Sequence, residues 1–391
     1  MDVRGGLVSP ELEARAIAWR RHLHANPELS FEEHETSAFV AETLRSFGGG
    51  LEIERPTPTS VVARLRGSRS GRVVALRADL DALPIHEENS VSYASTRAGV
   101  MHACGHDGHT AMLLAAAASL VERRKSLAGE VRFVFQHAEE LPPGGAKALV
   151  AAGVVDGADL VAGVHLHSGL DTGLLSVMPG AVTAAADLFT LEIVGRGGHG
   201  AYPHETVDPV AVAAQVITNL QHIVARETDP FDSAVVSVTT LNGGVAKNVI
   251  PSSVTLGGTV RTVSAARREE VRDAIERVIR GVTEAHRATY VFDYEIGYDP
   301  VVNDPRAAAM VRDAIVGELG DAAFVEHPPV MGGEDFSAYG AAAPAAFFWV
   351  GSANESLETT FPHHHPRFDI DEAALRGGAA VFVRAALDAL G

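Results

Sequence analysis

The chain changes its secondary-structure pattern near residue 187 and changes back near residue 299. Between these points the apolar periodicity predicts four strands and two helices in the order β-α-β-β-α-β, at residues 188–194, 209 onwards, 234–241, 254–263, 266–285 and 290–296. This order is that of the split βαβ sandwich, a unit that can bury its own core. We therefore predict an inserted domain at residues 187–298, with residues 1–186 and 299–391 forming the two parts of a second domain.

The flanking segments alternate helix and strand patterns. Ser9 and Pro10 mark the start of a helix that runs to Asn26, and Gly48 ends a second helix that begins near Glu33. Further elements are expected as strands at residues 60–66, 72–77, 131–135 and 160–164 and as helices at residues 110–123 and 372–390. This alternation is typical of an α/β domain with a largely parallel sheet. A chain of 391 residues also exceeds what one hydrophobic core usually organises.

The composition is that of a globular protein and excludes several functions. Its 46% hydrophobic and 21% charged residues are ordinary values, and the formal net charge of −18 argues against nucleic acid, which attracts basic surfaces. No apolar run approaches the roughly 18 residues of a membrane span, and the first residues contain no apolar segment typical of a signal peptide. A single cysteine permits no internal disulfide, so we expect a cytoplasmic protein.

That cysteine lies in the densest run of metal-ligand residues in the chain, His102-Ala103-Cys104-Gly105-His106-Asp107-Gly108-His109. The thiolate of Cys104 and the imidazole of His106 are two residues apart and can bind one ion, while the glycines let the backbone fold closely around it. The alternative is that Cys104 is a small buried apolar residue and that the histidines are packed or solvated.

Four further groups of acids or histidines follow expected strands or lie in a proline-rich loop: Asp79-Leu80-Asp81, Glu139-Glu140, His165-Leu166-His167 and His363-His364-His365. Sites in α/β sheets assemble at the carboxyl ends of parallel strands, so we expect these groups to converge. Two alternatives remain open. The glutamate pair is also typical of solvated acids near a helix start, and the histidine triplet of a surface run that binds metal adventitiously.

Eight segments spread over the chain carry a resemblance to a known family: Arg21-His22-Leu23-His24-Ala25-Asn26-Pro27-Glu28, Leu76-Arg77-Ala78-Asp79-Leu80-Asp81-Ala82-Leu83-Pro84, the Cys104 octapeptide, Phe135-Gln136-His137-Ala138-Glu139-Glu140, Gly195-Arg196-Gly197-Gly198-His199-Gly200-Ala201-Tyr202-Pro203, Asn248-Val249-Ile250-Pro251, Gly332-Gly333-Glu334-Asp335-Phe336 and His364-His365-Pro366-Arg367-Phe368. They resemble the M20 family of metal-dependent amidohydrolases and peptidases, in its aminoacylase, hippurate hydrolase and indole-acetyl-amino-acid hydrolase branch. The resemblance implies a zinc-peptidase-like α/β catalytic domain with an inserted ferredoxin-like α+β dimerisation domain. A homodimer is then expected, with a tetramer left open.

Carried over residue by residue, the resemblance implies a two-metal centre. Its ligands would be Cys104, His106, Glu140, His165 and His364. Glu139 would remain free as the catalytic base, and Asp81 would support the site from behind. Asp79 stands where other branches have a histidine ligand, which favours the branch that uses Cys104. Within the histidine triplet we choose His364 because it lies two residues before Pro366.

The resemblance also implies how substrate is held. His199 would stabilise the oxyanion of the reaction by reaching into the partner subunit's site, while Asn248 and Arg261 would hold the substrate's carboxylate and Gly333 would contribute to substrate binding. The alternatives are a histidine in a glycine-rich loop, an asparagine at a turn and an arginine at a strand end.

These residue types predict hydrolysis of an amide. An amide carbonyl is a poor electrophile and water a poor nucleophile, and a metal ion corrects both. We therefore expect an enzyme that hydrolyses N-acyl L-amino acids to a carboxylate and a free amino acid, using zinc, manganese, cobalt or nickel. A dipeptidase or an N-carbamoyl-amino-acid hydrolase is the alternative with the same chemistry. A metal-bound binding protein without catalysis would need no spare carboxylate, and Glu139 beside Glu140 argues against it.

Overall fold

The computed structural model describes residues 6–391, and these residues form two compact units. The first unit contains the chain up to Val182, with Val301–Pro328 and Asp335–Gly391. The second contains Thr183–Pro300 together with the short segment Pro329–Glu334. Gly333 therefore belongs to the second unit.

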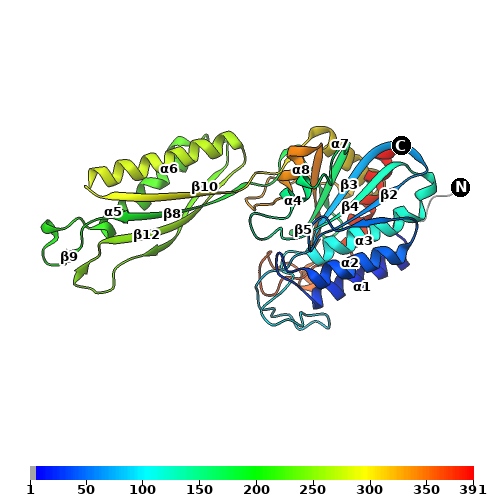
Figure 1. Ribbon diagram of the computed structural model, residues 1–391, viewed down its shortest axis with the longest axis horizontal. Helices are drawn as coiled ribbons and strands as arrows, with labels where there is room; N and C mark the ends of the chain where they lie inside the picture. The colour runs from blue at the N-terminus through cyan, green and yellow to red at the C-terminus, as the bar shows by residue number, and fades with distance from the viewer. Residues whose placement is uncertain (1–5) are drawn as a thin grey trace. The chain divides into compact units, whose positions relative to one another are not determined.

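The first unit is built on a seven-stranded sheet in the order β1-β2-β4-β3-β5-β15-β6 (Figure 1). The four central strands are parallel, but the pairs at both edges are antiparallel, so the sheet is mixed rather than largely parallel. The physical reason at one edge is the two-residue connection between β2 and β3, which is too short for a parallel crossover and reverses the chain. The strands are β1 (Glu52–Glu54), β2 (Val61–Arg66), β3 (Arg69–Asp79), β4 (Ala128–Gln136), β5 (Leu160–Asp171), β6 (Leu175–Ser176) and β15 (Ala345–Ala353).

Helices of the first unit pack on this sheet. The helix α3 is buried from His106 to Leu120 and contacts α1, α9 and β3, because its many alanines allow close approach. The Ser9 hydroxyl caps α1 by accepting a hydrogen bond from the Leu12 amide at 3.2 Å, as the sequence predicts. None of the described helices is long and apolar enough to cross a membrane. The helices are α1 (Pro10–Ala25), α2 (His34–Phe47), α3 (His106–Glu122), α4 (Ala146–Ala151), α7 (Pro305–Leu319), α8 (Ser337–Ala342) and α9 (Ala374–Leu390).

A two-stranded sheet joins the two points where the chain leaves and re-enters the first unit. In it β7 (Gly180–Ala181) pairs with β14 (Val302–Asn303). Next to this pair, the Val182 amide donates to the Val301 carbonyl oxygen at 2.9 Å.

The second unit has the order β-α-β-β-α-β that the sequence predicts. Its four strands form an antiparallel sheet in the order β10-β12-β8-β13, and α5 and α6 share one apolar core with it. Asp208 caps α5 by accepting from the Val210 amide at 2.9 Å. A separate pair, β9 (Gly198–His199) and β11 (Val249–Ile250), lies outside this sheet (Figure 1). The larger elements are β8 (Ala185–Val194), α5 (Pro209–His222), β10 (Ala234–Asn242), β12 (Ser253–Thr262), α6 (Ala265–Ala285) and β13 (Thr289–Tyr298).

Candidate metal centre

The parallel register of the first unit's sheet places the predicted acids and histidines of neighbouring strands side by side. Asp79 of β3 lies opposite Gln136 of β4, and Arg77 lies opposite Gly163 of β5. Two residues further on, His165 is therefore level with Asp79. The glutamate pair and Asp81 come directly after β4 and β3, as predicted.

The prediction that His165 and His167 follow their strand was wrong. The strand β5 does not stop at Val164 but continues to Asp171, and His165 and His167 pair with Trp349 and Gly351 of β15. Because β15 extends past the expected end of β5, both histidines are held by the sheet itself.

The Cys104 octapeptide forms a tight entry into α3. Gly105 has φ 94°, a left-handed conformation that glycine adopts freely, and His106 is the first residue of the helix. A side chain at Gly105 would also crowd Leu166, whose Cβ would lie 3.3 Å from an added Cβ. This turn places Cys104 and His106 on the same side of the chain, facing His165 of β5.

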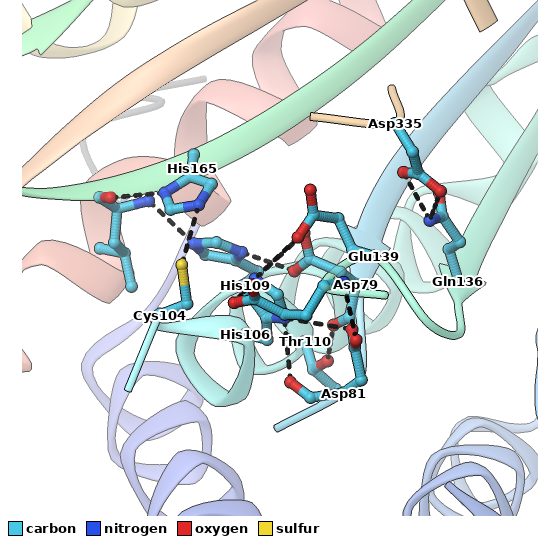
Figure 2. Close-up of polar contacts among 12 residues, drawn as sticks. Asp79, Asp81, Cys104, His106, His109, Thr110, Gln136, Glu139, His165 and Asp335 are labelled. Atoms are coloured by element: carbon cyan, nitrogen blue, oxygen red, sulfur yellow. Dashed lines mark hydrogen bonds and ion pairs between the residues drawn. The ribbon is translucent and has the colours of Figure 1, made fainter. Parts of the chain in front are cut away.

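The five predicted ligands fall into two overlapping groups, each with ligand atoms within 4.8 Å of one another: Cys104, His106 and His165, and Cys104, Glu140 and His364. The Cys104 sulfur lies 3.5 Å from Nε2 of His165, and Figure 2 shows it directed at that ring. Nε2 of His364 lies 3.4 Å from Oε1 of Glu140. Since Cys104 belongs to both groups, the arrangement is that of two adjacent sites with one common ligand.

Hydrogen bonds fix the imidazoles of buried His106 and half-buried His165 with Nε2 facing the cluster. His106 donates from Nδ1 to the Asp81 carbonyl oxygen at 2.9 Å, and His165 donates from Nδ1 to the Leu166 carbonyl oxygen at 2.6 Å. When each ring is neutral, Nε2 is then the unprotonated nitrogen, which is the form that ligates a metal.

Asp81 lies behind the predicted ligands and contacts two of them. Its Oδ2 accepts from the Glu140 amide at 2.9 Å and from the Ser30 hydroxyl at 2.7 Å. Its Oδ1 lies 3.3 Å from Nδ1 of His106. Asp81 thus contacts the Glu140 amide and the His106 ring on the side away from their ligand atoms, and its role in supporting the site stays a prediction.

The three histidines of the triplet lie in different surroundings. His364 has φ 65°, and its amide donates to the Ala103 carbonyl oxygen at 2.8 Å, which ties it to the cluster. His363 packs against His165 and Phe368 at ring distances of 5.2 and 5.0 Å. His365 stacks on Phe361, away from the groups named above.

The donor set fits a transition-metal ion. Two buried atoms, Nε2 of His106 and Oε1 of Glu140, make no hydrogen bond to any described residue. An unsatisfied buried polar atom costs about 1 to 3 kcal/mol, and coordination would satisfy both atoms. A thiolate, three imidazoles and a carboxylate are ligands that zinc and its neighbours accept.

The electrostatics of the cluster favour a cation. Burial disfavours the charged form of His106, but neighbouring carboxylates, Asp79 foremost, outweigh burial and raise its pKa to about 10. Burial and the carboxylates of Glu140 and Glu139 raise the pKa of the Cys104 thiol well above its usual range. Nearby carboxylates contribute to both shifts, and a bound metal ion would offset their negative charge in place of protons.

Glu139 lies at the same cluster. Its Oε2 is 4.0 Å from Nε2 of His106 (Figure 2). Its side chain is largely buried. Together with His106 and Glu140 it forms a further group of candidate ligand atoms. The position suits a carboxylate that acts on a molecule held at the cluster.

The candidate substrate residues of the second unit lie in two separate places, near the two ends of β12. His199 and Asn248 lie together: His199 pairs with Val249, and the Gly200 amide donates to the Asn248 carbonyl oxygen at 2.8 Å. Arg261 lies opposite Ala186 at the other end of β12.

Gly333 lies at the Arg261 end of the second unit. A Cβ added at Gly333 would lie 2.7 Å from that of Ala186, so only glycine fits this approach. The eight residue steps of β12 from Ser253 to Arg261 span about 27 Å. Within one chain, Asn248 and Arg261 therefore do not meet at a single carboxylate.

The family model described as Peptidase family M20/M25/M40 matches residues 75–388. The chain belongs to this family. It is 56% identical over 300 residues to the N-acyl-L-amino acid amidohydrolase of Geobacillus stearothermophilus, with 76% of this chain and 81% of that protein covered. It is 40% identical over 372 residues to thermostable carboxypeptidase 2 of Saccharolobus solfataricus, with 94% of each chain covered. The crystal structure of the YXEP protein of Bacillus subtilis, a dinuclear metal binding peptidase from the M20 family, matches with a TM-score of 0.83 at 35% identity, covering 97% of this chain and 99% of that one.

Three residues that pack beside the candidate metal centre of this M20 chain, His109, Asp79 and Arg77, were not among the predicted site residues. His109 donates from Nδ1 to Asp79 Oδ1 at 2.6 Å and accepts from the Leu166 amide at Nε2 at 2.8 Å (Figure 2). Asp79 also accepts from buried Arg77 at 2.7 Å. With both ring nitrogens engaged, His109 links α3 to β5 beside His165 rather than offering a ligand. Its position in the octapeptide marked His109 as a polar residue near the predicted ligands. The sequence did not show that His109 connects α3 to β5.

Proposed function

We propose that this M20 protein hydrolyses the amide bond of N-acyl L-amino acids, releasing a carboxylate and a free amino acid. The observation that carries the proposal is the pair of ligand groups that share Cys104, with the carboxylate of Glu139 beside them. The similarity to the Geobacillus N-acyl-L-amino acid amidohydrolase supports the substrate class.

The proposed cofactor is a pair of divalent transition-metal ions held by Cys104, His106, Glu140, His165 and His364. Support comes from the unsatisfied buried atoms of His106 and Glu140 and from the dinuclear metal binding of the YXEP protein. The thiolate favours zinc, while manganese, cobalt and nickel also suit the histidines and carboxylate. When bound, the ions polarise the amide carbonyl and lower the pKa of water toward about 7.

The two adjacent glutamates have different proposed roles, metal binding for Glu140 and proton transfer for Glu139. Glu140 faces His364 and serves the metal, so its oxygens are committed. One carboxylate oxygen of Glu139 accepts a proton from water while the water oxygen bonds to the amide carbon, and Glu139 then passes this proton to the amide nitrogen. The C–N bond breaks, the amino acid leaves with a neutral amine, and the acyl group leaves as a carboxylic acid that loses its remaining proton to solvent.

Substrate recognition is proposed to be shared between two subunits. Three bonds separate the amide carbon of an N-acyl amino acid from its carboxylate carbon, so one molecule cannot contact both ends of β12. We assign Arg261 and Gly333 to the binding of the substrate of their own chain. We assign His199 and Asn248 to the binding of the substrate of the partner subunit. The second unit would then be the dimerisation domain, with the first unit catalytic. A reducing cytoplasm is the proposed location, since it would keep Cys104 available as a thiolate ligand.

A peptidase activity is the second candidate. Saccharolobus thermostable carboxypeptidase 2 is 40% identical to this chain. A peptide and an N-acyl amino acid both carry an amide next to an amino acid with a free carboxylate, so Arg261 would serve either one.

The test is hydrolysis of acetyl, benzoyl, indole-acetyl and long-chain acyl amino acids, dipeptides and N-carbamoyl amino acids, each as the free acid and as the methyl ester. The enzyme is first dialysed against a chelator, and then zinc, manganese, cobalt, nickel or magnesium is added. We expect no activity after chelation, restoration by a transition metal but not by magnesium, and slow reaction of the esters. Full activity with less than a tenth of a metal ion per chain would refute the metal mechanism, and activity on peptides alone would favour the second candidate.

A further inference from the structure

The turn that precedes the glutamate pair has an unfavourable backbone. Ala138 has φ 50° and lies between the end of β4 and Glu139. This left-handed conformation costs a residue with a Cβ about 1 to 2 kcal/mol. In the loop between α1 and α2, Phe31 also has a positive φ, of 68°. Contacts elsewhere must hold both residues in place.

One buried carboxylate oxygen contacts both strained residues. Oε1 of Glu33 accepts hydrogen bonds from the Ala138 amide at 2.7 Å and from the Phe31 amide at 3.0 Å. Glu33 is fully buried, and it directly precedes α2, whose first residue is His34. This oxygen therefore ties the loop before α2 to the turn after β4, 105 residues away along the chain.

The other side of the turn is held as well. The Ala138 carbonyl oxygen accepts from the Gly145 amide at 3.1 Å, and the Glu140 amide donates to Asp81 at 2.9 Å. With these anchors both glutamate side chains reach the candidate metal centre. Glu139 lies 4.0 Å from His106, while Glu140 lies 3.9 Å from His106 and 3.4 Å from His364.

We propose that Glu33 is a positioning residue, whose side-chain oxygen holds the left-handed turn at Ala138 and so sets the positions of the Glu139 and Glu140 carboxylates at the candidate metal centre. This rests on the proposed function for the effect on catalysis. A shift of about 1 Å in a catalytic group can lower a rate on the order of 100-fold, so a loosened turn should be visible in kcat.

The anchor needs an acceptor rather than a charge. Burial and the nearby carboxylate of Asp81 raise the pKa of Glu33 to about 7, so a neutral carboxyl group is readily reached. A neutral carboxyl still offers its carbonyl oxygen to both amides, and a glutamine amide does the same. Glu33→Gln should therefore preserve the turn, whereas Glu33→Met removes the acceptor and keeps a side chain of similar length.

Glu28 provides a matched control in the same loop. It is also a largely buried glutamate that accepts from backbone amides, those of Glu35 and Thr36, at 3.2 and 2.7 Å. These amides belong to α2 and not to the glutamate turn. Glu28→Met should lower stability in the way that Glu33→Met does, without changing kcat.

The experiment compares these variants at saturating metal, with each chain's fold checked by circular dichroism. We expect Glu33→Met to lower kcat by about 10-fold to 100-fold with KM within about 3-fold, and Glu33→Gln and Glu28→Met to stay within about 3-fold of wild type in both. Adding Ala138→Gly to Glu33→Met should recover at least about 3-fold in kcat, because glycine reaches a positive φ without an anchor. A purely structural role for Glu33 would show no such rescue.

A second readout does not depend on hydrolysis. In the cobalt-loaded protein, the visible absorption reports the geometry around the metal, and Glu33→Met should change it while Glu28→Met should not. Wild-type kcat and an unchanged cobalt spectrum in folded Glu33→Met would overturn the proposal, as would equal losses of kcat in Glu28→Met. If Glu33→Met does not fold, Glu33→Asp takes its place, because its side chain is one methylene too short to reach both amides. An inactive wild type with a Glu33-dependent cobalt spectrum would instead reject the proposed function and leave the positioning role standing.

Discussion

Mixed dimers test the proposed sharing of the active site. The perturbation is to combine a chain that lacks the base, Glu139→Gln, with a chain that carries a substitution in the second unit. If His199 serves the partner's metal centre, a heterodimer of Glu139→Gln and His199→Ala contains one intact site, built from one chain's Glu139 and the other's His199. Random mixing of equal amounts makes half of the dimers mixed, so recovered activity should be about a quarter of wild type.

The positions of residues along β12 predict which other second-unit variants restore activity in heterodimers with Glu139→Gln. Asn248 lies with His199 beyond the Ser253 end of β12, and Ser253 is about 27 Å from Arg261, from eight steps of 3.4 Å. Asn248→Ala should therefore complement Glu139→Gln as His199→Ala does. Arg261→Ala should not, because the chain that keeps Glu139 would then lack its own Arg261. Loss of a hydrogen bond to a charged carboxylate costs about 1.5 to 3 kcal/mol, or about 10-fold to 150-fold, which is enough to distinguish the two outcomes.

The assay is the initial rate of hydrolysis of a good N-acyl amino acid after subunit exchange, with heterodimers counted by native mass spectrometry. The single homodimers give the background rates, and wild type mixed with Glu139→Gln gives the scale. Equal recovery with Asn248→Ala and Arg261→Ala would contradict the division of the two residues between subunits. No recovery with His199→Ala, despite counted heterodimers, would place His199 in its own chain's site or outside catalysis.

Two further predictions concern the glutamate pair and the second unit. Glu139→Gln should keep its metal, measured by elemental analysis, while its kcat falls about 100-fold to 10,000-fold. Glu140→Gln should lose metal. More than a tenth of wild-type turnover in Glu139→Gln would reject the assignment of Glu139 as base and Glu140 as ligand. Burial raises the pKa of Asp187, but hydrogen bonds from Arg268, the Gly297 amide and Tyr294 outweigh it and hold the pKa below its ordinary value. A depressed carboxyl pKa contributes stability above the unfolded pKa of about 4, and this is lost as pH falls through the lower folded value. Asp187→Asn should thus lower the free energy of unfolding by about 3 kcal/mol at pH 7 in urea titrations, with a smaller difference below about pH 4; a difference that does not depend on pH would contradict this role.

The sequence predicted those parts of the molecule whose signal is local. The octapeptide around Cys104 was recognisable because ligand residue types and glycines lie next to one another, whereas the choice of His364 rests on the family resemblance and on its spacing from Pro366. The second unit was readable because its sheet has one buried face, which gives alternating apolar residues along β8.

The parts that the sequence did not predict depend on contacts between distant segments. The end of β5 was misplaced because pairing with β15, nearly 200 residues later, carries the strand through His165 and His167. The contact of Glu33 with Ala138 left no trace in the sequence, because alanine does not signal a positive φ. Arg261 and Asn248 were matched to one substrate group, and only the register of β12 revealed their separation.

The pairing of β7 with β14 brings the two ends of the second unit together, so this unit can be removed or replaced by another domain. The chain leaves and re-enters the first unit at Val182 and Val301, which are joined by a backbone hydrogen bond of 2.9 Å. A linker of a few residues could close this gap and produce a shortened protein that keeps all five proposed metal ligands and Glu139. The segment Pro329–Glu334 would lose its partner in such a protein, because the Ala184 amide donates to the Gly332 carbonyl oxygen. Trimming that segment as well would yield a stand-alone metal-binding core, onto which a different insertion could be grafted at the same junction.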